Sequence, residues 1–366
     1  MAKDKVKISI VRGAFLNPFE LQNYYPLVGK YNIRAVSSLH PISEDIKIPL
    51  TKLSSPTDLP DFPFKMPILN RLFIDAHYLF GLEKAIAGSD IVHVAETYYH
   101  YTIQAIKAKQ KGLVKKVVST VWEVIPFNNE GIRGRKEFKK LAYEYVDHFL
   151  AVTNLARKAL LEEGVNDGKI SVIPMGVDLA RFRPAHRESR EINIICISRL
   201  VEEKGVGELV KAFLRLREKN NNLKLTLVGD GPLKNNFLNI PGVEIKKVPY
   251  GRIHLEYQNA DIFCLPSKTT KYWQEQYGMA LVEAIACGLP IITTKTGAIG
   301  EVCADAAIYS KQGDVNDLKS KLERLIGNKE TRLALSKKAG KRALAVFDHR
   351  ETAKKLDTLY QKVLWE

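Results

Sequence analysis

The sequence predicts an α/β protein made of two doubly wound domains, each a parallel sheet covered by helices. Short runs rich in valine and isoleucine alternate with stretches of helical period along the whole chain, which is typical of parallel sheets. Most of these runs are apolar throughout, as expected for strands covered on both faces. A length of 366 residues suits two domains of about 150 to 200 residues each.

The expected strands recur in both halves of the chain. In the first half they are Val6–Val11, Ile91–Ala95, Val117–Val124 and Phe149–Thr153. In the second half they are Ile192–Ser198, Leu223–Gly229, Val243–Pro249, Ile262–Ser267 and Pro290–Thr294. His93 lies inside one of these runs, and we expect it to be a core residue rather than a catalyst.

The link between the halves lies near Pro184 to Glu191, where the sequence is polar and has no sustained apolar period. We therefore expect a first domain at 1–185 and a second at 186–349, with a C-terminal helix at 350–366 packing back on the first. Ligands of open parallel sheets bind at the carboxyl ends of the strands. A cleft between the two domains is the expected site.

Composition narrows the class of protein. The chain is 45% hydrophobic and 27% charged, which is typical of a globular protein. Its four cysteines lack CxxC spacing, so we expect neither a zinc site nor a disulfide framework. No apolar run approaches the roughly 18 residues of a membrane span, and the N-terminal run is too short for a signal peptide. We expect a cytoplasmic protein, at most peripheral on the inner membrane face.

The net charge of +15 is shared by both halves, but residues 107–140 form a basic segment in the first. From Arg135 on, helical period places Phe138, Leu141, Ala142 and Tyr145 on one face and Lys136, Lys139 and Lys140 on the other. An anionic membrane surface is the candidate partner of this segment, and a solvated face stays open. No nucleic-acid-binding fold is recognisable, so nucleic acid is not an expected partner.

The densest functional signal runs from Trp273 to Ile292. Glu275 precedes a turn at Tyr277 and Gly278, after which a helical period begins and includes Glu283. Gly278 lets a ligand approach the backbone, and the free amides of the first helical turn bind anions such as diphosphate. An ordinary amphipathic helix with solvated glutamates has the same spacing.

Two further signals follow expected strands of the second half. Arg199 and Lys204 come just after one strand, where they can neutralise a diphosphate, although such basic pairs are often solvated. The turn Gly229-Asp230-Gly231 follows the next strand and has part of a dinucleotide-binding glycine pattern.

Taken in order, these motifs resemble glycosyltransferase family 4, the retaining GT-B enzymes also called glycosyl transferases of group 1. The resemblance covers nearly the whole second half, through the segments IPMGVDLARFRP, ISRLVEEKG, LVGDGP, YQNADIFCLPS, EQYGMALVEAIACGLPII and TGAIGEV. It implies the GT-B fold, in which two Rossmann-like domains face a central cleft.

The resemblance also implies roles for single residues. Arg199 and Lys204 would hold the diphosphate of the donor, Glu283 the ribose hydroxyls, and Glu275 the transferred sugar. The backbone amides around Tyr277, Gly278 and Met279 would lie near that sugar. Tyr250, within Val248–Arg252, and the turn Gly229-Asp230-Gly231 would border the base.

The implied activity is transfer of a sugar, with retention of configuration, from a UDP- or GDP-linked donor to a saccharide, lipid-linked or small polyol acceptor. The departing phosphate oxygen would help to deprotonate the acceptor, so no dedicated base is needed. The chain has no D-x-D motif. We expect no metal and no cofactor other than the nucleotide diphosphate sugar as co-substrate.

The first half departs from the family pattern. Where relatives carry a histidine that touches the donor sugar, this chain has Trp122 followed by Glu123. We place the acceptor or sugar side of the site at Gly13, Trp122 and Glu123, near the aromatic stretch Glu96–Tyr101. Packing at an interdomain surface is an equal alternative for these side chains. A nucleotide-sugar epimerase and a non-catalytic nucleotide-sugar-binding protein stay open as functions.

Overall fold

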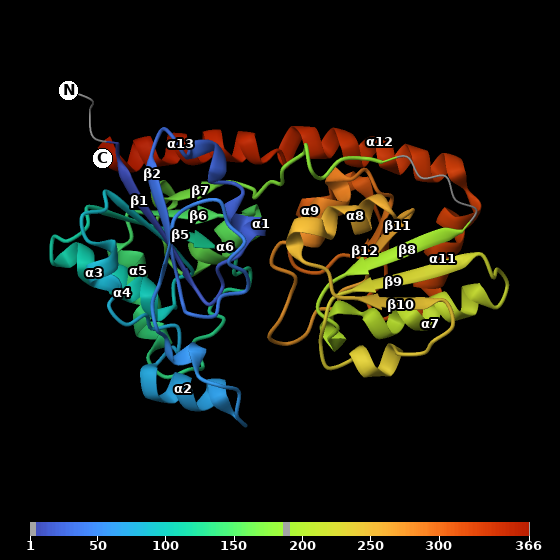
Figure 1. Ribbon diagram of the computed structural model, residues 1–366, viewed down its shortest axis with the longest axis horizontal. Helices are drawn as coiled ribbons and strands as arrows, with labels where there is room; N and C mark the ends of the chain where they lie inside the picture. Colours follow the sequence, from blue (N-terminus) through green and yellow to red (C-terminus); the bar gives the residue numbers. More distant parts are fainter. Residues whose placement is uncertain (1–4, 186–190, 366) are drawn as a thin grey trace. The chain divides into compact units, whose positions relative to one another are not determined.

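The structure, a computed structural model, describes residues 5–185 and 191–365 and divides into two compact units. The first unit consists of Met1–Met175 and Arg350–Glu366, and the second of Gly176–His349. Each is built on one parallel sheet, as predicted (Figure 1). The expected boundary near Pro184 to Glu191 falls partly on residues 186–190, which lie outside the described residues.

Residues 176–185, which we expected in the first domain, lie in the second unit. Val177 donates its amide to Phe347 at 2.8 Å, and Phe182 is fully buried with its ring 6.1 Å from that of Tyr257. A Cβ at Gly176 would lie 2.6 Å from the carbonyl oxygen of Phe347. The first residues of the second unit therefore pack against its last residues.

The first unit has a seven-stranded sheet in the order β3-β2-β1-β4-β5-β6-β7, with every adjacent pair parallel. The strands are β1 (Lys7–Gly13), β2 (Asn32–Ser37), β3 (Leu50–Lys52), β4 (Ile91–Ala95), β5 (Lys116–Val121), β6 (His148–Ala151) and β7 (Ile170–Val172). The helices are α1 (Pro18–Leu21), α2 (Lys65–Phe73), α3 (Leu82–Ile86), α4 (His100–Gln110), α5 (Arg135–Tyr145), α6 (Asn154–Glu162) and α13 (His349–Trp365).

Helix α13 packs on the first unit, although it follows the whole second unit in the chain. The Tyr360 hydroxyl lies 2.6 Å from Nδ1 of His93 on β4, and Asp357 accepts a bond of 2.5 Å from Tyr31. His93 is fully buried and its pKa lies well below the usual value, because burial and then the charge of Arg12 disfavour its protonation. The prediction that His93 is a core residue is confirmed.

The second unit has a six-stranded sheet in the order β10-β9-β8-β11-β12-β13. Its strands are β8 (Ile192–Ile197), β9 (Leu223–Val228), β10 (Val243–Lys246), β11 (Ile262–Leu265), β12 (Ile291–Thr294) and β13 (Ala307–Ser310). Its helices are α7 (Val206–Arg217), α8 (Ile253–Gln258), α9 (Met279–Ala286), α10 (Ile299–Cys303), α11 (Val315–Gly327) and α12 (Lys329–Val346). Helix α7 packs beside α11, and α9 beside α8 and α12 (Figure 1).

Each sheet has one point where the strand order reverses. In the first unit this point lies between β1 and β4, and in the second between β8 and β11. The loops that follow these strands diverge to opposite faces of the sheet and leave a crevice at its carboxyl edge, which is where doubly wound folds bind ligands. Both reversal points are therefore the places to examine for a site.

Among residues 5–185 and 191–365, no helix combines the length and the apolar composition that crossing a membrane requires.

Candidate functional site

An ion pair joins the two loops at the reversal point of the second unit. Lys204 follows β8 and Glu275 follows β11, and Nζ of Lys204 lies 2.6 Å from Oε2 of Glu275. Nζ also lies 4.6 Å from the centroid of the Trp273 ring, and Ser267 donates a weaker bond of 3.4 Å to Oε2 of Glu275. Both charged side chains are largely buried, at 13% and 9% exposed. The pair thus holds a cation and a carboxylate at the edge of the sheet.

Glycines allow the loops around this pair to pack closely. Gly205, at the start of α7, has a φ of +67°, and a Cβ there would lie 2.0 Å from the carbonyl oxygen of Pro266. Gly297, after β12, has a φ of +51°, and a Cβ there would lie 2.1 Å from the carbonyl oxygen of Glu275. Lys204 and Glu275 are therefore fixed by backbone contacts that only glycine permits.

Helix α9 begins beside this ion pair. Its first residue, Met279, follows Gly278, which has a left-handed φ of +84° and lies next to the side chain of Glu275. Tyr277, just before it, is buried. The amides of a first helical turn lack partners within the helix and attract anions. Lys204, Glu275 and the N-terminus of α9 thus lie together, as the predicted site requires.

Arg199 lies on the same loop but is directed to solvent. Its side chain is 67% exposed, and its guanidinium pairs with Glu203 at 3.4 Å. The structure therefore brings Lys204, but not Arg199, into contact with Glu275.

The turn after β9 packs against the loop after β8. A Cβ on Gly229 would lie 1.9 Å from the carbonyl oxygen of Ser198, and one on Gly231 would lie 2.5 Å from that of Leu200. The side chain of Asp230 faces solvent, where a hydrogen bond from Lys247 lowers its pKa. The glycines of this turn thus support the loop that includes Arg199 and Lys204.

Glu283 lies inside α9 and is buried, with 4% of its surface exposed. Its Oε2 accepts a bond of 2.7 Å from Tyr257, and burial raises its pKa to about 7 against the effect of that bond. Glu275 is likewise buried. The alternative of an amphipathic helix with solvated glutamates is therefore wrong, because both carboxylates are held inside the unit.

Arg181 contacts Tyr250 and acts on the charge of Glu283. This residue was not predicted from the sequence as part of the site. Its guanidinium lies near both rings, 4.7 Å from that of Phe182 and 4.4 Å from that of Tyr250, and donates to the Tyr250 carbonyl. The positive charge of Arg181 also favours the ionised form of Glu283. The signal was present in the segment GVDLARF, which we interpreted only as a link.

The three residues predicted in the first unit lie at the carboxyl edge of its sheet. Gly13 ends β1 with a φ of +52°, and a Cβ there would lie 3.3 Å from the Tyr101 ring. Trp122 follows β5 and donates its amide to Glu96 at 2.9 Å. The Glu123 carboxylate accepts bonds from two backbone amides and from two side chains of its own loop, so it organises that loop.

The predicted faces of the basic helix need correction at two residues. On α5, Lys139 is buried and pairs with Glu163 at 2.6 Å, whereas Leu141 is exposed. The long aliphatic stem of lysine can be buried while its charge is met by an acid, here the Glu163 that caps the end of α6. Helical period alone could not indicate that partner. Lys136 and Lys140 are exposed as expected.

Two family models match consecutive parts of the chain. The model described as Glycosyltransferase Family 4 matches residues 49–181, and that of Glycosyl transferases group 1 matches residues 179–342. Together they span most of both units and include the ion pair, α9 and the loops after β4 and β5.

Two curated relatives are 26% and 28% identical to parts of this chain. A phosphatidylinositol N-acetylglucosaminyltransferase subunit of Arabidopsis thaliana is 26% identical over 260 residues, which are 68% of this chain and 57% of the relative. A GDP-mannose-dependent monoacylated phosphatidylinositol monomannoside mannosyltransferase of Corynebacterium glutamicum is 28% identical over 64% of this chain and 66% of the relative. The matches thus span between about half and two thirds of these relatives.

Solved structures share the fold over nearly the whole chain. A glycosyltransferase from Rickettsia africae has a TM-score of 0.74 at 19% identity and covers 99% of both chains. Anabaena Alr3699/HepE, in complex with UDP-glucose, has a TM-score of 0.76 at 15% identity and covers 97% of this chain and 99% of the other. At these identities the likeness establishes the fold, which is the GT-B fold with two Rossmann-like domains.

Proposed function

The chain belongs to glycosyltransferase family 4, and on that premise we propose that it transfers a hexose or related sugar from a UDP- or GDP-linked donor to an acceptor, with retention of configuration. The observation that carries this proposal is the Lys204–Glu275 ion pair beside the start of α9. Lys204 and Glu275 both lie at the reversal point between β8 and β11, where a doubly wound sheet binds its ligand.

The physical chemistry of the reaction suits these groups. Breaking the bond between a sugar and a diphosphate increases negative charge on the departing oxygens, so fixed donors aimed at them stabilise the transition state more than the ground state. Lys204 supplies an ammonium and α9 supplies backbone amides. Glu275 holds Lys204 in place before the donor arrives and remains beside the sugar afterwards. In this proposal the departing phosphate oxygen accepts the acceptor proton.

The comparisons support the donor class but leave the base open. The relative from Corynebacterium is described as GDP-mannose-dependent, whereas Alr3699/HepE was solved with UDP-glucose. We therefore propose a nucleotide diphosphate sugar and test both bases.

We expect UDP or GDP to raise the melting temperature of the full chain. A ligand at about 100 times its Kd stabilises a protein by about 2.7 kcal/mol, which differential scanning fluorimetry resolves. UMP and GMP are the controls, because they lack the second phosphate that Lys204 and α9 would bind. The proposal fails if neither diphosphate shifts the transition. If the bound donor is epimerised without any acceptor, the enzyme is an epimerase instead.

We also propose that the first unit meets an anionic membrane surface, from which a lipid-linked acceptor would be taken. Helix α2 lies at one end of this unit (Figure 1), and Phe64, which caps its start, is 78% exposed. On the helix, Ile68 and Leu72 follow at intervals of four residues and are 45% and 71% exposed. The start of α5 adjoins this segment, because Gly134 packs against Ile74. Exposed cations lie on α2, at Arg71, and at the start of α5, at Arg133, Lys136 and Lys140. An apolar stripe among cations suits insertion between anionic headgroups.

Vesicle co-sedimentation tests this surface. The chain is expected to sediment with phosphatidylglycerol vesicles and less with phosphatidylcholine vesicles. The double variant Phe64→Ser and Leu72→Ser should bind at least about tenfold more weakly, since each side chain contributes about 1 kcal/mol or more of apolar transfer. Leu333→Ser with Leu344→Ser removes two exposed leucines of α12 as the matched control. Equal binding of the two double variants, or self-association of the chain through α2, contradicts the proposal.

A further inference from the structure

Three aromatic rings stack across the reversal point of the first unit. Phe15 follows β1, Tyr99 follows β4, and His77 comes from the segment after α2. The His77 ring centroid lies 4.8 Å from that of each neighbour, and Phe15 and Tyr99 lie 5.2 Å apart. Phe15 is 38% exposed, whereas His77 is only 7% exposed. The stack therefore presents one open aromatic surface at the position where this fold binds ligands.

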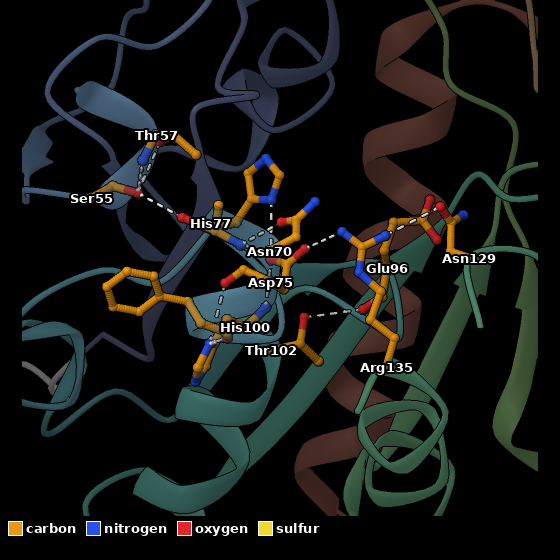
Figure 2. Close-up of polar contacts among 12 residues, drawn as sticks. Ser55, Thr57, Asn70, Asp75, His77, Glu96, His100, Thr102, Asn129 and Arg135 are labelled. Carbon is orange, nitrogen blue, oxygen red and sulfur yellow. Dashed lines mark hydrogen bonds and ion pairs between the residues drawn. The ribbon is translucent and has the colours of Figure 1, made fainter. Parts of the chain in front are cut away.

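Asp75 fixes the orientation of His77 (Figure 2). Its Oδ1 accepts bonds of 3.0 Å from both the amide and Nδ1 of His77, and its Oδ2 pairs with Arg135 at 2.5 Å. Burial alone would raise the pKa of Asp75, but His77 and then Arg135 hold it below its usual value. Nδ1 donates to the carboxylate, so in a neutral imidazole the other ring nitrogen of His77 is an acceptor.

Glu96 combines a strained backbone with a buried oxygen that has no partner. Its φ is +58°, and this conformation is fixed from outside, because its amide donates to Thr120 and its carbonyl accepts bonds from Thr102 and Ser119. One carboxyl oxygen accepts the Trp122 amide, and the other is buried without a hydrogen bond. Such residues persist where the surroundings impose them, and they cluster at ligand sites.

Two more buried polar atoms without a partner lie in the same neighbourhood. They are the Tyr101 hydroxyl and Nε of Arg135. The Tyr101 ring lies 5.2 Å from that of Tyr99, and the Arg135 guanidinium lies 5.1 Å from the Tyr98 ring. Groups that can bond to hydroxyls therefore gather beside the aromatic stack.

We propose that this cluster binds the acceptor as an uncharged, hydroxyl-bearing ring, with one face on Phe15 and hydroxyls on Glu96 and His77. This inference rests on the proposed function and names the acceptor class. We expect this position to disfavour a phosphate, because the Glu123 carboxylate lies beside Glu96 and the nearby cation of Arg135 is already paired with Asp75.

The chemistry of Glu96 fits a hydroxyl partner. Burial, and then the Glu123 carboxylate, raise the pKa of Glu96 to about 8, so near neutral pH its carboxyl group can both donate and accept. A sugar or cyclitol hydroxyl has the same double capacity. The C–H face of a sugar or cyclitol ring is flat and apolar, so it can pack against an aromatic ring.

Saturation-transfer NMR on the full chain tests the inference. The probes are glucose, mannose, galactose, N-acetylglucosamine and myo-inositol, each compared with glucose 6-phosphate. We expect at least one uncharged ring to bind, and glucose 6-phosphate to bind at least about tenfold more weakly. If no uncharged ring binds, or if the phosphate ester binds more tightly, the inference is wrong.

Three variants separate binding from a purely structural role. His77→Phe keeps the ring in the stack but lacks the acceptor nitrogen, and Glu96→Met keeps the length of the side chain without its oxygens. Each should weaken ring binding about tenfold, the effect of a lost hydrogen bond to a buried polar group. Glu96→Gln keeps the hydrogen-bonding capacity and should restore binding. Glu44→Gln, in an exposed pair with Lys52, is the control.

The nucleotide shift distinguishes the two possible failures. All these variants lie in the first unit and should keep the stabilisation by UDP or GDP, and an unchanged unfolding transition of the first unit without ligand shows that they fold. If the nucleotide shift persists while His77→Phe and Glu96→Met bind rings like the wild type, this inference fails alone. If no nucleotide binds the wild type, the proposed function fails whatever the ring probes show.

Discussion

Lys204→Met is expected to weaken the binding of UDP or GDP by about 10- to 100-fold, because a charge-assisted hydrogen bond contributes about 1.5–3 kcal/mol. In the free protein Lys204 is fixed by Glu275 at 2.6 Å, so its ammonium is already oriented when the diphosphate arrives. Isothermal titration of the wild type and the variant measures the loss directly.

The same variant should also destabilise the unliganded protein. Removing Lys204 leaves the largely buried Glu275 carboxylate with only the long bond from Ser267, and breaking such a pair costs about 3 kcal/mol or more. Adding Glu275→Gln should recover most of this stability without recovering nucleotide affinity. Lys319→Met, which removes an ion pair with Glu323 on α11, is the control and should change neither. Nucleotide binding by Lys204→Met at wild-type strength would contradict the assignment.

Gly205→Ala is expected to destabilise the protein strongly. Its left-handed backbone disfavours alanine, and the new Cβ would lie 2.0 Å from the carbonyl oxygen of Pro266. The loop with Lys204 must then separate from the end of β11. We expect a loss of about 3 kcal/mol or more in the free energy of unfolding, measured in urea, together with loss of the nucleotide shift.

Gly207 provides the matched control two residues further along. It lies within α7, and a Cβ there would meet nothing within 4 Å. Gly207→Ala should therefore stabilise the protein by about 0.5–1 kcal/mol, as alanine does in a helix interior. If both variants behave alike, the close approach of Gly205 to Pro266 is not what shapes the loop.

The sequence predicted the parallel sheets where strands are apolar throughout. The expected strand at Ile91–Ala95 has the bounds of β4, and those of the second half match β8 to β12 within a few residues. Strands β2 and β3 were not predicted because their sequences, NIRAVS and LTK, are short and mixed. Arg34 of β2 donates to Ser9 on the neighbouring strand, a tertiary contact that apolar patterning does not reveal.

The candidate site was predictable where its residues directly follow a predicted strand or precede a predicted helix. Lys204, Glu275 and Gly278 each stand at a loop or helix start, so the order of strands and helices brought them to one edge. The exposure of Arg199 and the burial of Lys139 depend on side-chain partners, which spacing does not give. His77 and Asp75 lie in a segment without strand or helical period. Only the folded chain places them beside Tyr99.

The position of α13 has a consequence for how the protein is made. This helix supplies Tyr360 and Asp357 to the first unit, yet the ribosome translates it after every residue of the second. Domains of most proteins fold in order of synthesis, beginning at the N-terminus. Here the second unit can fold completely on the emerging chain, while the sheet that was translated first must wait for the last helix to cover it.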